Sequence, residues 1–208
     1  KKAAIRGVES NGMMCSAREL ELGDDHAGII ELAPDAPVGA SFADVAGLDD
    51  PLFDVAVTPN RPDCMGVRGI ARDLAALGLG TLKPLAAEPV ASTGPPATDV
   101  TIAPGSGCWT FWRREVRGLR NGPSPDWLQR RLKAVGLRPI SALVDITNFF
   151  TVDTGRPLHV YDVAKLTGAI HVRRGRPGER FDALNDKAYE PGAEDIVIAD
   201  DSGAIGLG

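Results

Sequence analysis

One hairpin signal near the end of the sequence sets the fold class: Asp195-Ile196-Val197-Ile198-Ala199-Asp200-Asp201-Ser202-Gly203-Ala204-Ile205-Gly206-Leu207. The apolar, β-branched run at its start predicts a buried strand over 195–199. The Asp-Asp-Ser-Gly sequence that follows is typical of a turn. Residues 204–208 are then expected to form the return strand of the hairpin, so the sheet is expected to be antiparallel around it.

Upstream of this hairpin the pattern alternates between helix and strand. Ser124-Pro125-Asp126 is a strong helix start, and Gly136 is a fitting end. A second helix is expected over 141–153, ended by Gly155, although its many β-branched residues also suit a strand. Further strands are expected over 99–103, 110–119, 158–161 and 169–173, with another hairpin at Asn185-Asp186. We therefore predict an α+β domain over 99–208, with a mixed or antiparallel sheet and flanking helices.

The first part of the chain is expected to be smaller and more irregular. Ser16 and Glu19 match a capping box, and Gly23 follows as a stop. Strands are predicted over 27–32 and 53–57, with a turn-rich stretch at 58–64 whose role we expect to be structural. Asp63 is a candidate cap for the helix that follows. That helix carries one apolar stripe, and Gly78 ends it: Val67, Ile70, Ala71, Leu74 and Leu77.

Two glycines in this helix region lie one turn apart. Gly66 and Gly69 have no side chain, so we expect another backbone to approach closely there. The Pro-rich stretch 84–99 has neither helical nor strand periodicity and is expected to be a linker. It divides the chain into about 1–85 and 99–208. The chain opens on Lys1 and closes within the return strand, so we expect a piece of a longer polypeptide.

Composition excludes several classes of protein. The chain has 208 residues, with 23 basic and 28 acidic side chains, so the net charge is −5. This excludes nucleic-acid binding by bulk charge alone, although arginines do cluster, in the first reading as a solvated face. No apolar run is long enough for a membrane span or a signal peptide, so we expect a cytoplasmic protein. These clusters are Arg113, Arg114, Arg117, Arg120; Arg130, Arg131, Lys133, Arg138; and Arg173, Arg174, Arg176.

Metal and phosphate sites are not predicted from spacing. Three cysteines (Cys15, Cys64, Cys108) lie far apart without a Cys-x-x-Cys pair. The histidines have no metal-ligand spacing, and neither common phosphate-binding loop is present. We expect His171 to be a plain surface residue and His26 to be structural. Asp145, in an apolar run, is expected to need a hydrogen-bonding partner, either Arg138 or the neighbouring Thr-Asn pair.

The densest polar group combines Thr147 and Asn148 with His159 in the segment 155–162. If 141–153 is a helix, the Thr-Asn pair falls near its last turns, and Pro157 keeps the following chain extended so that His159 can fold back. Such a hydroxyl, amide and imidazole together could hold a water or a ribose. The alternative from the residues alone is a backbone hydrogen bond for His159 and a helix cap by Asn148.

Five strings in one order resemble the family of bacterial phenylalanine–tRNA ligase β subunits, along nearly the whole chain. They are Gly7-Val8-Glu9-Ser10-Asn11-Gly12-Met13-Met14-Cys15-Ser16, Thr58-Pro59-Asn60-Arg61-Pro62-Asp63-Cys64, Arg68-Gly69-Ile70-Ala71-Arg72-Asp73-Leu74, Val144-Asp145-Ile146-Thr147-Asn148 and Pro157-Leu158-His159. The resemblance implies that residues 1–45 are the C-terminal part of an inserted OB-fold tRNA-binding domain. Residues 46–85 are then a small strand–turn–helix α/β module, 86–98 a linker, and 99–208 a tRNA-editing domain truncated at its C-terminus.

The resemblance also implies a function. The family charges tRNA(Phe) with phenylalanine, using ATP and magnesium at a site on its α subunit, within a heterotetramer of two α and two β subunits. This segment would need no cofactor or metal of its own. The editing domain hydrolyses tyrosine wrongly attached to tRNA(Phe), and by position the resemblance implies His159, Asn148 and Thr147 as its site residues.

The sequence departs from the family pattern in several places. Arg156 stands where glutamine is usual, Phe149 and Tyr161 exchange the common aromatics, and Trp109 replaces a common proline. The family's acidic editing segment follows a Gly-rich stretch that begins near Gly206, so the site is expected to be incomplete in this chain. The alternatives are a free-standing aminoacyl-tRNA deacylase and a non-catalytic RNA-binding scaffold.

Overall fold

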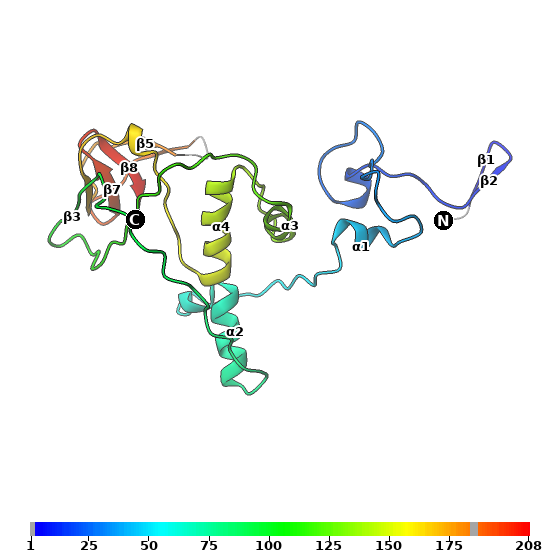
Figure 1. Ribbon diagram of the computed structural model, residues 1–208, viewed down its shortest axis with the longest axis horizontal. Coiled ribbons are helices and arrows are strands. Elements are labelled where there is room, and N and C mark those ends of the chain that lie inside the picture. The colour runs from blue at the N-terminus through cyan, green and yellow to red at the C-terminus, as the bar shows by residue number, and fades with distance from the viewer. Residues whose placement is uncertain (1–2, 184–186) are drawn as a thin grey trace. The chain divides into compact units, whose positions relative to one another are not determined.

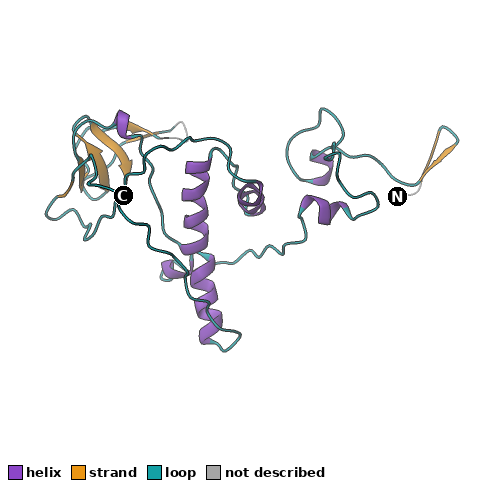
Figure 2. Cartoon of the chain, in the orientation of Figure 1, coloured by secondary structure: helices purple, strands orange, loops and turns teal. Residues whose placement is uncertain are grey.

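The computed structural model describes residues 3–183 and 187–208, and the chain divides into two compact units, Lys1–Phe53 and Asp54–Gly208. The expected borders of the small module and the linker stay predictions, although residues 86–98 contain no helix or strand. Among the described helices, none has the length and apolar character to cross a membrane. Figure 2 shows how much of the chain is loop between short helices and strands.

The first unit contains little regular structure. β1 (Ala3–Ile5) and β2 (Val8–Ser10) form an antiparallel hairpin, followed by the 3-10 turn η1 (Arg18–Leu20) and helix α1 (Phe42–Ala46). Arg6 and Gly7 both take positive φ, so a tight turn separates the two strands.

The predicted capping box of this unit is confirmed. The Ser16 backbone N–H donates to Glu19 Oε2 at 2.8 Å, and the Glu19 N–H donates to Ser16 Oγ at 3.3 Å. The Ser16 hydroxyl also lies 3.1 Å from His26 Nδ1, which gives His26 the structural role expected for it. The turn ends at Glu21, in a left-handed conformation, and not at Gly23.

The second unit contains the predicted sheet. Its strands are β3 (Val100–Ile102), β4 (Ile170–Arg174), β7 (Ile196–Asp200) and β8 (Gly203–Leu207), in the order β3-β4-β7-β8. β3 runs parallel to β4, and the other pairs are antiparallel, with a bulge between β7 and β8 at Ile198/Ala199. The predicted hairpin and the α+β class with a mixed sheet are therefore confirmed (Figure 1).

The core of this sheet is aliphatic. Ile170 and Val172 of β4 and Val197, Ile198 and Ala199 of β7 are all buried. A 3-10 turn, η3 (Val163–Lys165), precedes β4, and a two-stranded ribbon is formed by β5 (Phe181–Asp182) and β6 (Ala188–Tyr189). The ribbon flanks the hairpin expected at Asn185-Asp186, whose tip lies outside the described residues.

Helices form the other half of the second unit. They are the 3-10 turn η2 (Pro62–Cys64), α2 (Val67–Ala76), α3 (Asp126–Ala134) and α4 (Ala142–Thr154). Their predicted extents are confirmed, so the β-branched residues of α4 did not convert it to a strand. α4 packs on α3 and α2, and α2 packs on η2, whereas no described helix packs on a described strand. Figure 1 shows α2 meeting α4 at the end where α4 stops.

The close backbone approach predicted at the two glycines is confirmed. A Cβ placed on Gly66 would lie 2.4 Å from the backbone nitrogen of Gly155, and one on Gly69 would lie 1.8 Å from the carbonyl oxygen of Asp63. Gly155 itself ends α4 with a positive φ of 67°, which favours glycine. Two helices thus meet through backbone atoms, at a spacing that no side chain would permit.

Several expected strands do not form. Residues 27–32, 53–57, 110–119 and 158–161 are not in strands. Alternation of apolar residues predicts extended backbone, but a strand also needs a neighbour that pairs its N–H and C=O groups in a continuous ladder. Among the described residues none of these segments has such a ladder, although the Ile30 N–H donates to the Cys15 carbonyl at 2.8 Å. The expected cap by Asp63 is also wrong, because its carboxylate accepts from Arg61 and Arg72 and makes no bond to the start of α2.

Asp145 is fully buried and satisfied, as a structural residue should be, but its partners differ from those expected. Its carboxylate accepts from the Ser124 hydroxyl and from the Ile140 backbone N–H, the latter at 2.8 Å. The bond to Ser124 ties the start of α3 to the first turns of α4. Neither Arg138 nor the Thr-Asn pair takes part.

Candidate functional site

The predicted Thr147–Asn148 pair lies in the middle of α4 and not in its last turns. Asn148 precedes the final helical residue by six positions, which is about 9 Å along the helix axis. The Thr147 hydroxyl donates to the Val144 carbonyl at 2.7 Å, so it remains available only as an acceptor. The Asn148 amide is half-buried and makes no hydrogen bond among the described residues.

His159 lies in the loop that connects α4 to the sheet. Its imidazole stacks on the ring of Tyr161, with centroids 6.1 Å apart and planes within 7°. His159 as a whole residue is exposed, but the atoms packed around its ring remove part of the hydration of a charged imidazole, which lowers the pKa of His159 below its usual value. The imidazole is therefore neutral at neutral pH and has a lone pair with which to accept a proton.

Tyr161 is the unusual member of this pair. Its hydroxyl oxygen is buried and has no hydrogen-bond partner among the described residues, and burial raises the pKa of Tyr161 to about 12. A Cβ on Gly206 of β8 would lie 2.8 Å from this oxygen and 3.9 Å from His159 Nδ1. Both rings thus lie against β8 where that strand has no side chain.

The structure joins these predicted residues only in part. Thr147 and Asn148 are neighbours on α4, but in the described part of the chain no hydrogen bond or ring contact links either to His159. The pocket between them stays a prediction. A neutral imidazole beside an unpaired buried hydroxyl is nevertheless a place where a polar ligand group would find both an acceptor and a donor.

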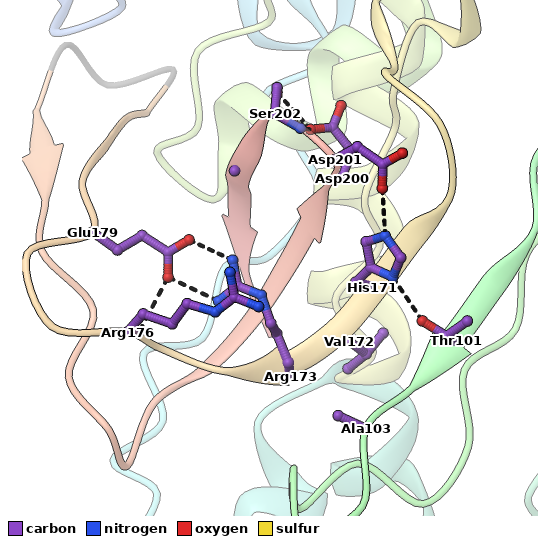
Figure 3. A pocket seen from close by; sticks show the side chains of 11 residues that line it. Thr101, Ala103, His171, Val172, Arg173, Arg176, Glu179, Asp200, Asp201 and Ser202 are labelled. Atoms are coloured by element: carbon purple, nitrogen blue, oxygen red, sulfur yellow. Dashed lines mark hydrogen bonds and ion pairs between the residues drawn. The ribbon is translucent and has the colours of Figure 1, made fainter.

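A second polar group lies around another histidine and lines a pocket of about 560 Å³ (Figure 3). His171 of β4 is held at both ring nitrogens: Nε2 lies 2.7 Å from Asp201 Oδ1, and Nδ1 lies 2.8 Å from Thr101 Oγ1. We interpreted His171 as a plain surface residue and missed these bonds. Strand alternation predicts the face of a side chain, but the partners come from β3 and the β7–β8 turn.

An ion pair lines this pocket on the side across from His171 (Figure 3). Arg173 donates to Glu179 through two nitrogens, one at 2.8 Å, and each side chain is only 11% exposed. The guanidinium and the Arg176 backbone N–H hold the pKa of Glu179 below its usual value, with the bond to Arg173 as the larger cause. These groups satisfy one another, as do the His171 partners, which is typical of a structural network.

One further cluster has the composition of a cation site. Asp63, Cys64 and Asp73 bring a sulfur and carboxylate oxygens within 4.8 Å of one another. The Arg61 guanidinium already donates to all three, at 3.0 Å to Asp63, 2.8 Å to Cys64 and 2.7 Å to Asp73. Arg61 supplies the positive charge that a metal would otherwise bring, so we assign this cluster to the stability of the 58–64 turn.

We compared the sequence with known protein families, and one family model matches the second part of the chain. The family model of the B3/4 domain matches residues 107–208, which include α3, α4, the strands β4, β7 and β8, and both His159 and His171. Strand β3, with the His171 partner Thr101, precedes the matched range. Relatives that match nearly the whole chain cover its first part as well.

Those relatives carry one name. A phenylalanine–tRNA ligase β subunit from Novosphingobium aromaticivorans is 62% identical over 203 residues, which are 98% of this chain and 25% of the relative. The proteins of the same name from Zymomonas mobilis and Brucella abortus are 55% and 57% identical, over 98% and 96% of this chain and 26% and 25% of their own lengths. The chain therefore spans about a quarter of the curated relatives that it matches.

Proposed function

Since the chain belongs to the family of phenylalanine–tRNA ligase β subunits, we propose that its B3/4 region hydrolyses tyrosine wrongly attached to tRNA(Phe). Phenylalanine attachment itself, with ATP and magnesium, is assigned to the α subunit, in a cytoplasmic heterotetramer of two α and two β subunits. In this proposal the chain contributes tRNA binding and editing, and holds no cofactor.

The observation that carries the proposal is the neutral His159 imidazole beside the unpaired Tyr161 hydroxyl. An editing pocket must accept tyrosine and reject phenylalanine, which is smaller, so size cannot discriminate. It must instead offer hydrogen bonds to the extra hydroxyl, which remain unmade when phenylalanine enters. Sites built this way discriminate by about 10⁴-fold.

The reaction needs only a positioned water, because an aminoacyl ester is already activated. His159 accepts a proton from the water as its oxygen attacks the ester carbonyl carbon. The tetrahedral intermediate then expels the ribose oxygen, which takes the proton from His159. The products are free tyrosine and uncharged tRNA, and His159 is neutral again. Asn148 and Thr147 bind the aminoacyl end, the former as donor and the latter as acceptor.

The test replaces His159 by Ala in the full α/β enzyme. We expect release of tyrosine from tyrosyl-tRNA(Phe) to slow by about 10² to 10⁴-fold, the range for a lost general base, with phenylalanine attachment unchanged. His26→Ala is the matched control, since His26 serves a turn of the first unit. Unchanged tyrosine release in the His159 variant would reject the proposal and favour the non-catalytic RNA-binding scaffold.

The pH profile gives a second measurement. Because the pKa of His159 lies below its usual value of about 6.5, more than half of the imidazole is neutral at that pH. Tyrosine release should therefore fall to half of its plateau only at a pH below about 6.5. A decline that begins well above this value would contradict a role for His159 as the base.

A further inference from the structure

Two of the three tryptophans are almost fully exposed. Trp109 is 94% exposed and Trp112 is 86% exposed, and they lie three residues apart. The third, Trp127, packs edge-on against Phe149, with centroids 5.7 Å apart. An aromatic side chain offers roughly 150–250 Å² for burial, and neighbouring exposed apolar groups mark interaction sites. The two exposed indoles therefore indicate a binding surface.

The charge around these indoles is opposite to that of the chain. The Trp–Arg segment, residues 109–120, has four arginines and one glutamate, a net charge of 4 − 1 = +3, whereas the chain has −5. The Glu115 carboxylate is 15% exposed and accepts from the Ala97 N–H and from Arg117 Nε, each at 2.6 Å. The acid is thus largely covered. Arg113 lies 3.8 Å from Asp99 and Arg117 pairs with Glu115, which leaves Arg114 and Arg120 without a carboxylate partner among the described residues.

The Trp–Arg segment alternates between half-buried and exposed residues over 111–116, and one hydrogen bond anchors it. Phe111, Arg113 and Glu115 are half-buried, while the residues between them, including Trp112 and Arg114, are exposed. The Arg114 guanidinium donates to the Val90 carbonyl at 2.8 Å, which fixes the segment to the preceding Pro-rich stretch. Residues two apart on an extended chain share one side and are separated by about 7 Å, which places the Trp112 indole next to the Arg114 guanidinium. Trp109 precedes this alternation and is exposed independently of it.

We propose that the Trp–Arg segment binds single-stranded RNA. Bases stack on the indoles of Trp109 and Trp112, and phosphates pair with the guanidinium groups of Arg114 and Arg120. Stacking platforms combined with cations are the general means of holding single strands. A positive segment on a negative chain selects a polyanion over a neutral or acidic protein surface. The inference rests on the proposed function in one respect: the substrate of editing ends in unpaired nucleotides.

The experiment measures fluorescence polarisation of a labelled, unstructured RNA of alternating adenosine and cytidine, titrated with the full chain. Trp109→Ala and Trp112→Ala should each weaken binding by about 5- to 150-fold, and Trp→Phe at either position should retain most of the affinity. Trp127→Phe is the matched control. Arg120→Gln should reduce the slope of log affinity against log salt by about 0.7.

Folding and function are separated by the design. Because both indoles are exposed, their replacement should leave the thermal midpoint unchanged, and His159→Ala should lose tyrosine release while it retains RNA affinity. The inference would be overturned if the Trp→Ala variants bound RNA as tightly as the unsubstituted chain, or if the affinity did not depend on salt. This holds whether or not the editing activity is found. The inference would also fail if the chain did not bind RNA but associated with itself, and if the double Trp→Ala variant abolished that self-association.

Discussion

Both halves of the second unit bury aliphatic side chains, such as Leu132 of α3 and Val172 of β4, but the elements of each half meet in different ways. In the helical half (η2, α2, α3, α4), backbones meet at Gly66 and Gly69, and polar groups such as Asp145 and Arg61 join the elements. In the sheet half (β3, β4, β7, β8), aliphatic side chains are buried between paired strands. Since no described helix packs on a described strand, each half should respond separately to damage.

The sharpest test of this separation is Gly69→Ala. A methyl group there would lie 1.8 Å from the Asp63 carbonyl oxygen, and backbone cannot move aside cheaply. We expect a loss of about 3 kcal/mol in the free energy of unfolding of the helical half. Amide hydrogen exchange should rise in α2 and α4 and stay unchanged in β4 and β7.

Gly122→Ala serves as the control, because a Cβ at that position meets no atom within 4 Å. Faster exchange of equal size in the helices and the sheet of the Gly69 variant would show that the halves unfold together, and the contrast drawn above would be lost.

Val172→Ala is the corresponding change in the sheet. The side chain is 1% exposed, so removing its methyl groups leaves a cavity and should cost about 2 kcal/mol. Exchange should now rise in β4 and β7 and not in α2. Thermal unfolding monitored by near-ultraviolet dichroism of Trp127, which lies on α3, should be nearly unaffected. A shift of that transition by the full amount would contradict separate halves.

The smallest expected effect concerns the Arg173–Glu179 pair of the sheet half. The folded pKa of Glu179 lies below its unfolded value, so the pair contributes stability above that unfolded value and loses it as pH falls through the folded pKa. Glu179→Gln should cost about 1.5 kcal/mol at neutral pH and flatten the acid limb of the stability curve. An unchanged acid limb would show that Glu179 does not set it.

Local signals in the sequence predicted much of this fold. The extents of α2, α3 and α4, the end of α4 at Gly155 and the β7–β8 hairpin depend on neighbours in the chain, and all are confirmed. The expected N-terminal side-chain caps do not form on these three helices. The failures depend on distant partners. The segments at 53–57 and 110–119 alternate like strands but lack a pairing neighbour, and Asp145 is satisfied by Ser124, across the turn between two helices.

The candidate site was less predictable than the fold. His159, Thr147 and Asn148 are singled out by resemblance, since the polar residues alone favoured a helix cap by Asn148 and a backbone hydrogen bond for His159. The burial of the Tyr161 hydroxyl without a partner depends on β8 passing at Gly206, 45 residues later in the chain. No local sequence pattern predicts that Gly206 lies next to the Tyr161 hydroxyl. The same holds for His171, whose partners at 101 and 201 come from both sides of it in sequence.

Gly155 ends α4, touches Gly66 and begins the loop to His159. The departure angle of that loop is consequently set by a chain segment nearly ninety positions earlier. Homologous sequences should record this as covariation: where position 66 gains a side chain, position 155 and the length of the 156–158 connection should change with it. Gly155 thus links the position of the His159 imidazole to the segment at Gly66, which is synthesised earlier.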